Sequence, residues 1–125
     1  MTSGVKRVFV NFTNHSSSKW SELQLREAET YGEILDIPFP SVDPECEKSY
    51  IYELANQYVH EITDKEPDCV LCQGEFCLSY AVIERLKAEK IKVVAACSRR
   101  VVEEISMATG TKKISKFEFV QFREY

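Results

Sequence analysis

Hydrophobic residues along the chain switch repeatedly between the two-residue period of strands and the longer period of helices. β-Branched and apolar positions fill the segment VKRVFVNF, which predicts a first strand at residues 5–12. The segment SELQLREAETYG has helical spacing and ends at a glycine, which predicts a helix over residues 21–32. The alternation then continues, with strands predicted at 33–39, 68–72 and 91–97 and helices predicted from 43 onward and at 75–90.

Two of these helix starts carry capping signals. Ser21 and Gln24 have the spacing of a capping box, and Trp20 and Leu25 have the spacing of a hydrophobic staple. The run Asp43-Pro44-Glu45 combines a cap residue, a first-position proline and an acid near the positive end of the helix dipole. The pattern therefore predicts helices that begin at these two places.

The end of the chain has a different pattern. The segments 99–107 and 112–125 read as two longer strands joined by the turn ATGT, which predicts a hairpin. Phe117 and Phe119 share one face of the second strand, whereas Val120 and Phe122 share the other. This phase slip predicts a β-bulge or burial on both faces.

Strand–helix alternation of this kind is typical of parallel strands joined by right-handed crossovers. We therefore expect an α/β fold comprising one domain over residues 1–125. Its parallel sheet would have the order 2-1-3-4, helices on both faces and a C-terminal antiparallel hairpin.

Composition agrees with a globular domain. The chain has 125 residues, of which 44% are hydrophobic and eight are Gly or Pro, so it can bury a core. No apolar run approaches the roughly 20 residues of a membrane span. The start, Met1 to Arg7, lacks the apolar core of a signal peptide, so we expect a cytoplasmic location and no membrane partner.

Five cysteines stand at positions 46, 69, 72, 77 and 97, an odd number that argues against a closed disulfide framework. Cys69 and Cys72 have the spacing of a metal knuckle or redox motif. They fall on a predicted strand, however, where residues three apart point to opposite faces. We expect small buried hydrophobic residues in a reducing compartment, and we predict no metal site.

Charge is distributed unevenly. The net charge is −4, with −7 over residues 1–70 and +3 over residues 71–125. The acidic total argues against nonspecific binding to long nucleic acid. The basic second part is either a solvated surface or a local site for a small anion.

Polar residues gather where strands end. In an open α/β sheet, ligands bind beyond the carboxyl ends of strands, at the point where the strand order reverses. The loop after the first strand, the turn after the third and the end of the fourth would meet there. The chain has no GxGxxG and no GxxxxGK[ST] motif, so the sequence supports no dinucleotide or nucleotide P-loop, and we predict no cofactor. The candidate ligand-binding residues are Asn11, Thr13, Asn14, Ser16, Ser17, Ser18, Gln73, Gly74, Glu75, Ser98 and Arg100.

Three further residues are candidates for catalysis: His15, Lys19 and Arg99. A histidine in a strand-end loop can act as general acid or base near neutral pH, or it can simply donate hydrogen bonds. The serines can bind a phosphate next to a helix N-terminus, or they can satisfy backbone amides in a long capped turn. Glu75 is either a helix cap or a catalytic base.

The strings NFTNHSSSKW, VLCQGEFCLSY, VVAACSRRVVEE and FEFVQFREY together resemble the small CRISPR-associated proteins of type III antiviral systems. Members of that family are single Rossmann-like (CARF-type) sensor domains and ring nucleases. The resemblance covers nearly the whole chain. It implies a homodimer that binds a cyclic oligoadenylate second messenger. In the ring nucleases a ribose 2′-hydroxyl attacks the adjacent phosphodiester without a metal.

The resemblance leaves several functions open. The first is a ring nuclease or binder of cyclic oligoadenylate, and the second is a non-catalytic sensor or sponge for the same messenger. A small enzyme acting on nucleosides or sugar phosphates ranks lower, because Asp43 and Glu75 are its only carboxylates near the rim. A protein-interaction module ranks last.

The expected homodimer also has a sequence signal. The predicted helix 75–90 carries a second apolar stripe, formed by Phe76, Tyr80 and Ile83, beyond the one that a single packing face needs. We expect this stripe either to form the dimer contact or to be covered by the terminal hairpin of the same chain.

Overall fold

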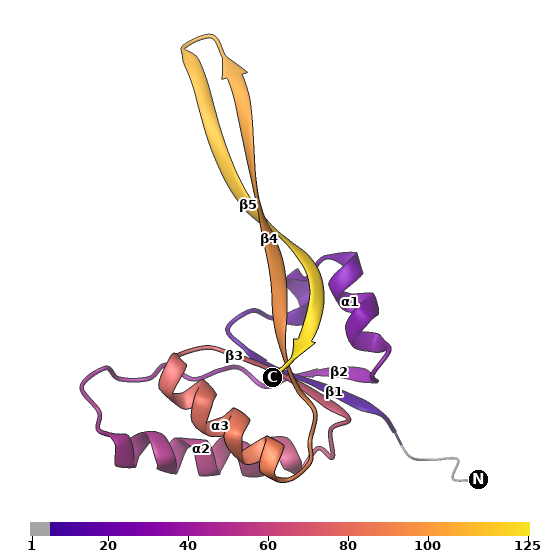
Figure 1. Cartoon of the computed structure of the whole chain (residues 1–125), viewed down its shortest axis with the longest axis vertical. Helices are drawn as coiled ribbons and strands as arrows, with labels where there is room; N and C mark the ends of the chain where they lie inside the picture. Colours follow the sequence, from indigo (N-terminus) through magenta and orange to yellow (C-terminus); the bar gives the residue numbers. More distant parts are fainter. Residues whose placement is uncertain (1–5) are drawn as a thin grey trace.

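A mixed five-stranded sheet with helices on both faces forms the centre of the molecule (Figure 1). The computed structural model describes residues 6–125, so Val5, the first residue of the predicted first strand, lies outside the described residues. The elements are β1 (Val8–Thr13), the 3-10 turn η1 (Ser17–Lys19), α1 (Glu22–Glu29), β2 (Glu33–Asp36), α2 (Lys48–Thr63), β3 (Cys69–Gln73), α3 (Phe76–Ala88), β4 (Val93–Met107) and β5 (Gly110–Glu124).

The strand order is β2-β1-β3-β4-β5. β1, β2, β3 and β4 pair in parallel, whereas β4 and β5 pair in antiparallel fashion. The α/β alternation and the C-terminal antiparallel hairpin are therefore confirmed, but the hairpin joins the sheet, which is mixed rather than parallel, and its fifth strand extends the expected order. The strands predicted separately at 91–97 and 99–107 are one continuous strand, because the pairing with β5 continues on both sides of an irregularity between Cys97 and Ser98.

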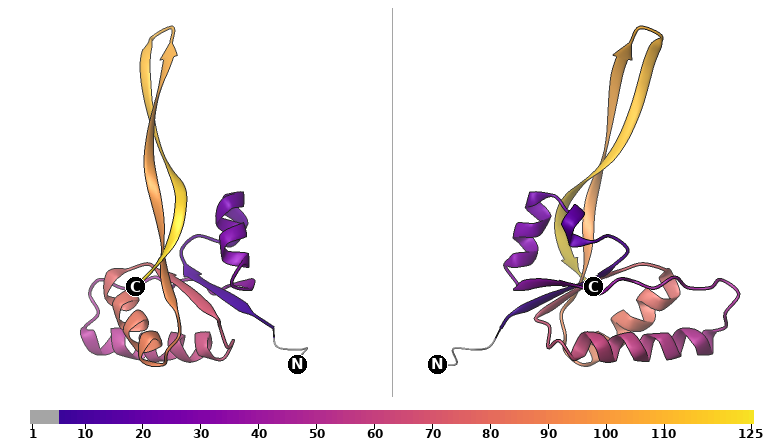
Figure 2. Two further views of the ribbon diagram at one scale, coloured as in Figure 1. Left: turned by 45° about the vertical axis from the view of Figure 1, so that its right-hand side comes forward. Right: turned by 180° about the vertical axis from the view of Figure 1, so that it is seen from behind.

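The two faces of the sheet bury separate apolar clusters. One cluster contains Phe9, Leu71 and Val94 and is covered by α1. The other contains Phe12 and Val70 and is covered by α2 and α3 (Figure 2). Alternation along each strand explains this division, since neighbouring side chains point to opposite faces.

The two cysteines of β3 follow the same rule. Cys69 lies in the cluster under α1 and Cys72 lies in the cluster under α2 and α3, and both are fully buried. Burial raises the pKa of each thiol to about 12. The prediction that they are core residues on opposite faces is confirmed.

Beyond the sheet, β4 and β5 continue alone as a long twisted ribbon. We call residues 98–119 the arm and the remaining described residues the body. β4 pairs with β3 only at Val93 and Val94, and its later residues pair with β5 alone. Figures 1 and 2 show the arm projecting away from the body in every view.

A bulge sits where the arm leaves the body. Cys97 pairs with Gln121 and Ser98 pairs with Phe119, so Val120 has no partner. The extra residue reverses the alternation and brings Phe117, Phe119 and Phe122 onto one face. The predicted β-bulge is confirmed.

The helix starts agree with the sequence in one case of two. Ser21 caps α1 by accepting a hydrogen bond from the Gln24 amide at 3.2 Å, as predicted. The second helix begins at Lys48 rather than near Asp43. The Asp43 carboxylate instead accepts from the Glu45 amide at 2.9 Å in a separate turn, and α2 starts close to Ile51, its first buried residue.

None of the helices within residues 6–125 is both long enough and apolar enough to span a membrane.

Candidate functional site

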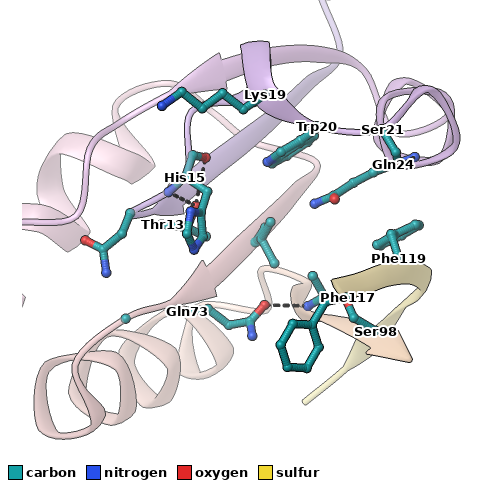
Figure 3. Close-up of a pocket in the computed structure, with 14 residues that line it drawn as sticks. Thr13, His15, Lys19, Trp20, Ser21, Gln24, Gln73, Ser98, Phe117 and Phe119 are labelled. Atoms are coloured by element: carbon teal, nitrogen blue, oxygen red, sulfur yellow. Dashed lines mark hydrogen bonds between the residues drawn. The ribbon is translucent and has the colours of Figure 1, made fainter. Parts of the chain in front are cut away.

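A cleft of about 680 Å³ lies between the carboxyl ends of β1 and β3, the start of α1 and the base of the arm (Figure 3). Ligands of α/β proteins bind at this edge of the sheet. The lining residues are Thr13, Asn14, His15, Lys19, Trp20, Ser21, Gln24, Leu71, Gln73, Gly74, Ala96, Ser98, Phe117 and Phe119.

The cleft exists because two neighbouring strands separate. The pairing of β3 with β4 ends at Leu71 and Val94, and β4 then turns away into the arm. Gln73 bridges the gap, since its Oε1 accepts a hydrogen bond from the Ala96 amide at 2.6 Å (Figure 3). Leu71 lines the space between the strands.

Three aromatic side chains line the cleft. Trp20 is half-buried and packs edge-on against Phe9, with ring centroids 6.2 Å apart. Phe119 packs against Phe122 at 4.8 Å, and Phe117 is 73% exposed. Aromatic faces of this kind offer stacking surfaces to flat ligands.

Two buried residues, Asn11 and Thr13, hold the loop that carries His15 in place. The Thr13 hydroxyl donates to the Asn11 Oδ1 at 2.8 Å and accepts from the His15 amide at 3.1 Å. The Asn11 Nδ2 donates to the His15 carbonyl and to the Asp36 carboxylate, both at 2.9 Å. The polar atoms of the Asn11 side chain are therefore hydrogen-bonded within the protein, and Asn11 does not line the cleft. Among the described residues, no hydrogen bond engages the His15 ring, which lies at the cleft (Figure 3).

The serines of this loop are also occupied by the protein itself. The Asp36 Oδ2 accepts from the Ser17 hydroxyl at 3.0 Å, the Ser17 amide at 3.2 Å and the Ser16 hydroxyl at 3.3 Å. Ser18 lies 2.9 Å from Ser16, oxygen to oxygen. A carboxylate of the protein itself thus accepts from Ser16 and Ser17, which favours the alternative of a capped turn, and phosphate binding by Ser16, Ser17 and Ser18 stays a prediction.

Three other candidates also lie outside the cleft lining. The Glu75 carboxylate caps α3 by accepting from the Leu78 amide at 2.7 Å, which is the cap alternative. Arg100 donates to the Ser115 hydroxyl at 2.9 Å, further along the arm. Arg99 lies opposite Glu118 in the register of the β4–β5 ladder, and strand alternation places it on the face opposite Ser98.

The structure brings seven of the candidates together. One of them, Gly74, leaves no room for a side chain, because an added Cβ would lie 2.6 Å from the Phe39 ring. The seven that line the cleft are Thr13, Asn14, His15, Lys19, Gln73, Gly74 and Ser98.

Sequence reasoning missed the aromatic side of the cleft. Trp20 and Gln24 were assigned only to the helix start, yet both line the cleft. Phe117 and Phe119 were used only to predict the bulge, from the strand face on which they lie. The signal that could have found them was the predicted bulge, which sets Phe117, Phe119 and Phe122 on a common face.

Charge in the cleft is simple. Lys19 is the one formally charged lining residue, and the lining set contains no Asp or Glu. The cleft is therefore suited to a neutral or anionic ligand with flat rings. Within residues 6–125, no three His, Cys, Asp or Glu side chains are grouped to hold a metal ion.

Comparison with known proteins places the chain in a family. A family model described as the uncharacterized protein MJ1673 family matches residues 7–123, and the chain belongs to this family. No curated protein matches the sequence.

Proposed function

We propose that this member of the MJ1673 family binds a cyclic oligoadenylate in the cleft and cleaves it without a metal, as a cytoplasmic homodimeric ring nuclease of type III CRISPR defence. The observation that carries the proposal is the composition of the cleft. Aromatic rings, side-chain amides and one lysine line it, and no carboxylate does.

The aromatic residues suit an adenine base. Phe117 is exposed and Trp20 is half-buried, so both present ring surface to the cleft. Stacking of a base on an aromatic side chain contributes about 1–3 kcal/mol. The Gln24 side chain and the Nε2 group of Gln73 would hydrogen-bond a base edge, because amides match the donor and acceptor pattern of adenine.

Lys19 suits the phosphodiester. Its ammonium is the positive charge of the lining set, and the missing carboxylates spare a phosphate from repulsion. Asn14 and Ser98 add neutral hydrogen-bond donors at the same rim. The hydrogen bonds that Lys19 would donate are charge-assisted and therefore stronger than the neutral ones from Asn14 and Ser98.

Cleavage requires one proton acceptor and one proton donor. The His15 imidazole takes the proton of a ribose 2′-hydroxyl as the 2′-oxygen attacks phosphorus. The bond from phosphorus to the 5′-oxygen breaks, and the leaving 5′-oxygen takes a proton from Lys19. The products are a 2′,3′-cyclic phosphate and a 5′-hydroxyl. Arg99 has no part in this scheme, because it lies outside the cleft.

A non-catalytic sensor or sponge for the same messenger is the second candidate. It is favoured by the fact that His15 is the sole imidazole among the lining residues, so the cleft offers few groups for proton transfer. An enzyme acting on nucleosides or sugar phosphates loses support, since neither Asp43 nor Glu75 lines the cleft.

Calorimetric titration with cyclic oligoadenylates of different ring size tests the binding proposal. Lys19→Ala should weaken binding by about 10- to 150-fold, the equivalent of roughly 1.5–3 kcal/mol for a hydrogen bond to a charged group. Phe117→Ala should weaken it by a similar factor through lost stacking. Arg100→Ala is the matched control, because it removes a cation outside the cleft and should leave affinity unchanged. Absence of binding to every ring would refute the proposal.

Incubation with the same ligands in EDTA, followed by chromatography, tests cleavage. The expected product is a linear oligoadenylate that ends in a cyclic phosphate. His15→Ala should slow its formation by roughly 10²-fold or more while binding is kept. Tight binding without product would instead establish the sensor or sponge.

A further inference from the structure

The arm carries an apolar surface that its own body does not cover. Alternation from the β4–β5 register places Val101, Ile105, Met107 and Ile114 on one face, opposite to the face of Phe117. We call these four residues the arm stripe. Ile105 is 42% exposed and Met107 is 54% exposed. A two-stranded hairpin on its own is marginally stable in water, so packing of this face against another surface would stabilise the arm.

A second uncovered surface lies on the body. Phe76 is 90% exposed and Tyr80 is 68% exposed, one helical turn apart on α3. The Tyr80 hydroxyl donates to the Glu84 carboxylate at 3.3 Å, which extends the row by another turn. We call Phe76, Tyr80 and Glu84 the α3 ridge. Ile83, which the sequence grouped with them, is half-buried against the core instead.

The arm of the same chain does not cover the α3 ridge. Figures 1 and 2 show the arm extending away from α3, and the exposure of Phe76 agrees with this. The alternative that the terminal hairpin folds over this helix within one chain is therefore wrong.

Charge favours contact between arm and body. Residues 98–119 contain five basic and three acidic side chains, a charge of +2. The rest of the chain contains eleven basic and seventeen acidic side chains, a charge of −6. The face of the arm stripe carries three basic side chains, Arg99, Lys112 and Lys116, against two acidic ones, Glu103 and Glu118, and the acidic Glu84 ends the α3 ridge. Opposite charge steers such surfaces together.

The length of the arm also fits a second body. Ten residues of extended strand, from Ser98 to Met107, span about 33 Å. A domain of 100 residues has a radius of gyration of about 13 Å, so the arm is long enough to cross one.

We propose that the arm of one chain docks across α3 of a second copy, with the arm stripe on the α3 ridge, in a two-fold dimer that contains two such contacts. A two-fold axis repeats the contact in both directions, which satisfies both uncovered surfaces at once. The proposal does not rest on the ligand assigned to the cleft, so either can fail without the other.

Light scattering at micromolar concentration tests the assembly. The intact chain should have twice the chain mass of 14.4 kDa. Replacing residues 103–114 with Asn-Gly shortens the arm to a two-residue hairpin turn below Val102 and Ser115, and this variant should be a monomer. A monomeric intact chain would overturn the proposal.

Two single substitutions test which face of the arm docks. Ile105→Asn removes an apolar side chain from the arm stripe and should raise the dimer dissociation constant at least about tenfold. Val102→Asn makes the same kind of change on the opposite face, at a side chain of 52% exposure, and should leave dimerisation unchanged. The reverse result would overturn the assignment of the arm stripe.

Complementation distinguishes docking on α3 from contact between two arms. The double variant Phe76→Ser and Tyr80→Ser should also be a monomer, with an unchanged circular dichroism spectrum because both side chains are exposed. Mixed with the short-arm variant, it should form a heterodimer, since the mixture retains one intact arm and one intact α3 ridge. A double variant that stays dimeric, or a mixture that stays monomeric, would overturn docking on α3.

Discussion

The body and the arm are stabilised by different interactions. In the body, β1 is buried along its whole length, with Phe9 under α1 and Phe12 under α2 and α3. In the arm, most side chains are exposed, and the two strands are joined by their own backbone ladder. Burial of apolar surface therefore stabilises the body, whereas the arm gains little from it.

The cleft lies at the boundary between these two regions. One side is made by the body, through His15, Lys19 and Trp20, and the other by the base of the arm, through Ser98 and Phe117. Phe119 joins the regions by packing on Phe122, which in turn lies 5.2 Å from Phe9. Phe117, which is exposed, can thus be changed without disturbing the core, whereas Phe119 is linked to the core through Phe122.

The largest expected effect is a truncation in the body. Phe12 is fully buried between Phe39 and Tyr58, with ring centroids at 4.7 and 5.1 Å. Phe12→Ala should lower the free energy of unfolding by about 3–5 kcal/mol through lost burial and a cavity. Urea denaturation measures this, and a loss below about 1 kcal/mol would show that the body is not the rigid region.

The buried thiols should give the body a dependence on alkaline pH. The pKa of Cys69 and of Cys72 is raised from 9.0 to about 12 by burial, so the folded state keeps both thiols protonated. Above about pH 9 the unfolded state loses these protons, and stability should fall by up to about 1.4 kcal/mol per pH unit for each thiol.

Urea denaturation between pH 8 and pH 10.5 checks this slope. The control is the variant Cys69→Ala with Cys72→Ala, which retains the tyrosines and lysines that also titrate. If its slope equals that of the intact chain, the thiols are not the cause.

A smaller effect is expected where α1 meets the cleft. Ser21 caps α1 through the Gln24 amide, so Ser21→Ala should cost about 1 kcal/mol. Thermal melting measures the loss, and Ser21→Thr, which keeps the hydroxyl, should recover most of it. Equal melting temperatures for the two variants would show that the cap does not hold this side of the cleft.

The smallest effect is expected on the arm. Phe117→Ala removes the same ring as Phe12→Ala, but from a side chain that is 73% exposed, and should cost under about 0.5 kcal/mol of stability. The two phenylalanines are thus a matched pair in the urea experiment. A large loss at Phe117 would mean that the arm contributes to the folding of the body, and the contrast between the regions would disappear.

Local signals in the sequence determined much of the fold. Alternating hydrophobic periods placed the strands and helices of the body, since each element must bury one face. Ser21 marked the start of α1, and the phase of the phenylalanines in β5 marked the bulge. The opposite burial of Cys69 and Cys72 followed from strand alternation alone.

The tertiary structure decided what local patterns do not contain. The carboxylate of Asp36, distant in sequence, accepts hydrogen bonds from Ser16 and Ser17 after β1, so two of the serines predicted to bind phosphate are bonded within the protein. Asp43 caps a turn rather than a helix, because α2 starts where its apolar stripe meets the core. Arg99 and Arg100 follow β4 in sequence but leave the cleft with the arm. Whether a polar side chain meets a ligand or the protein depends on partners that only the folded chain brings near, and the sequence determined the elements without those distances.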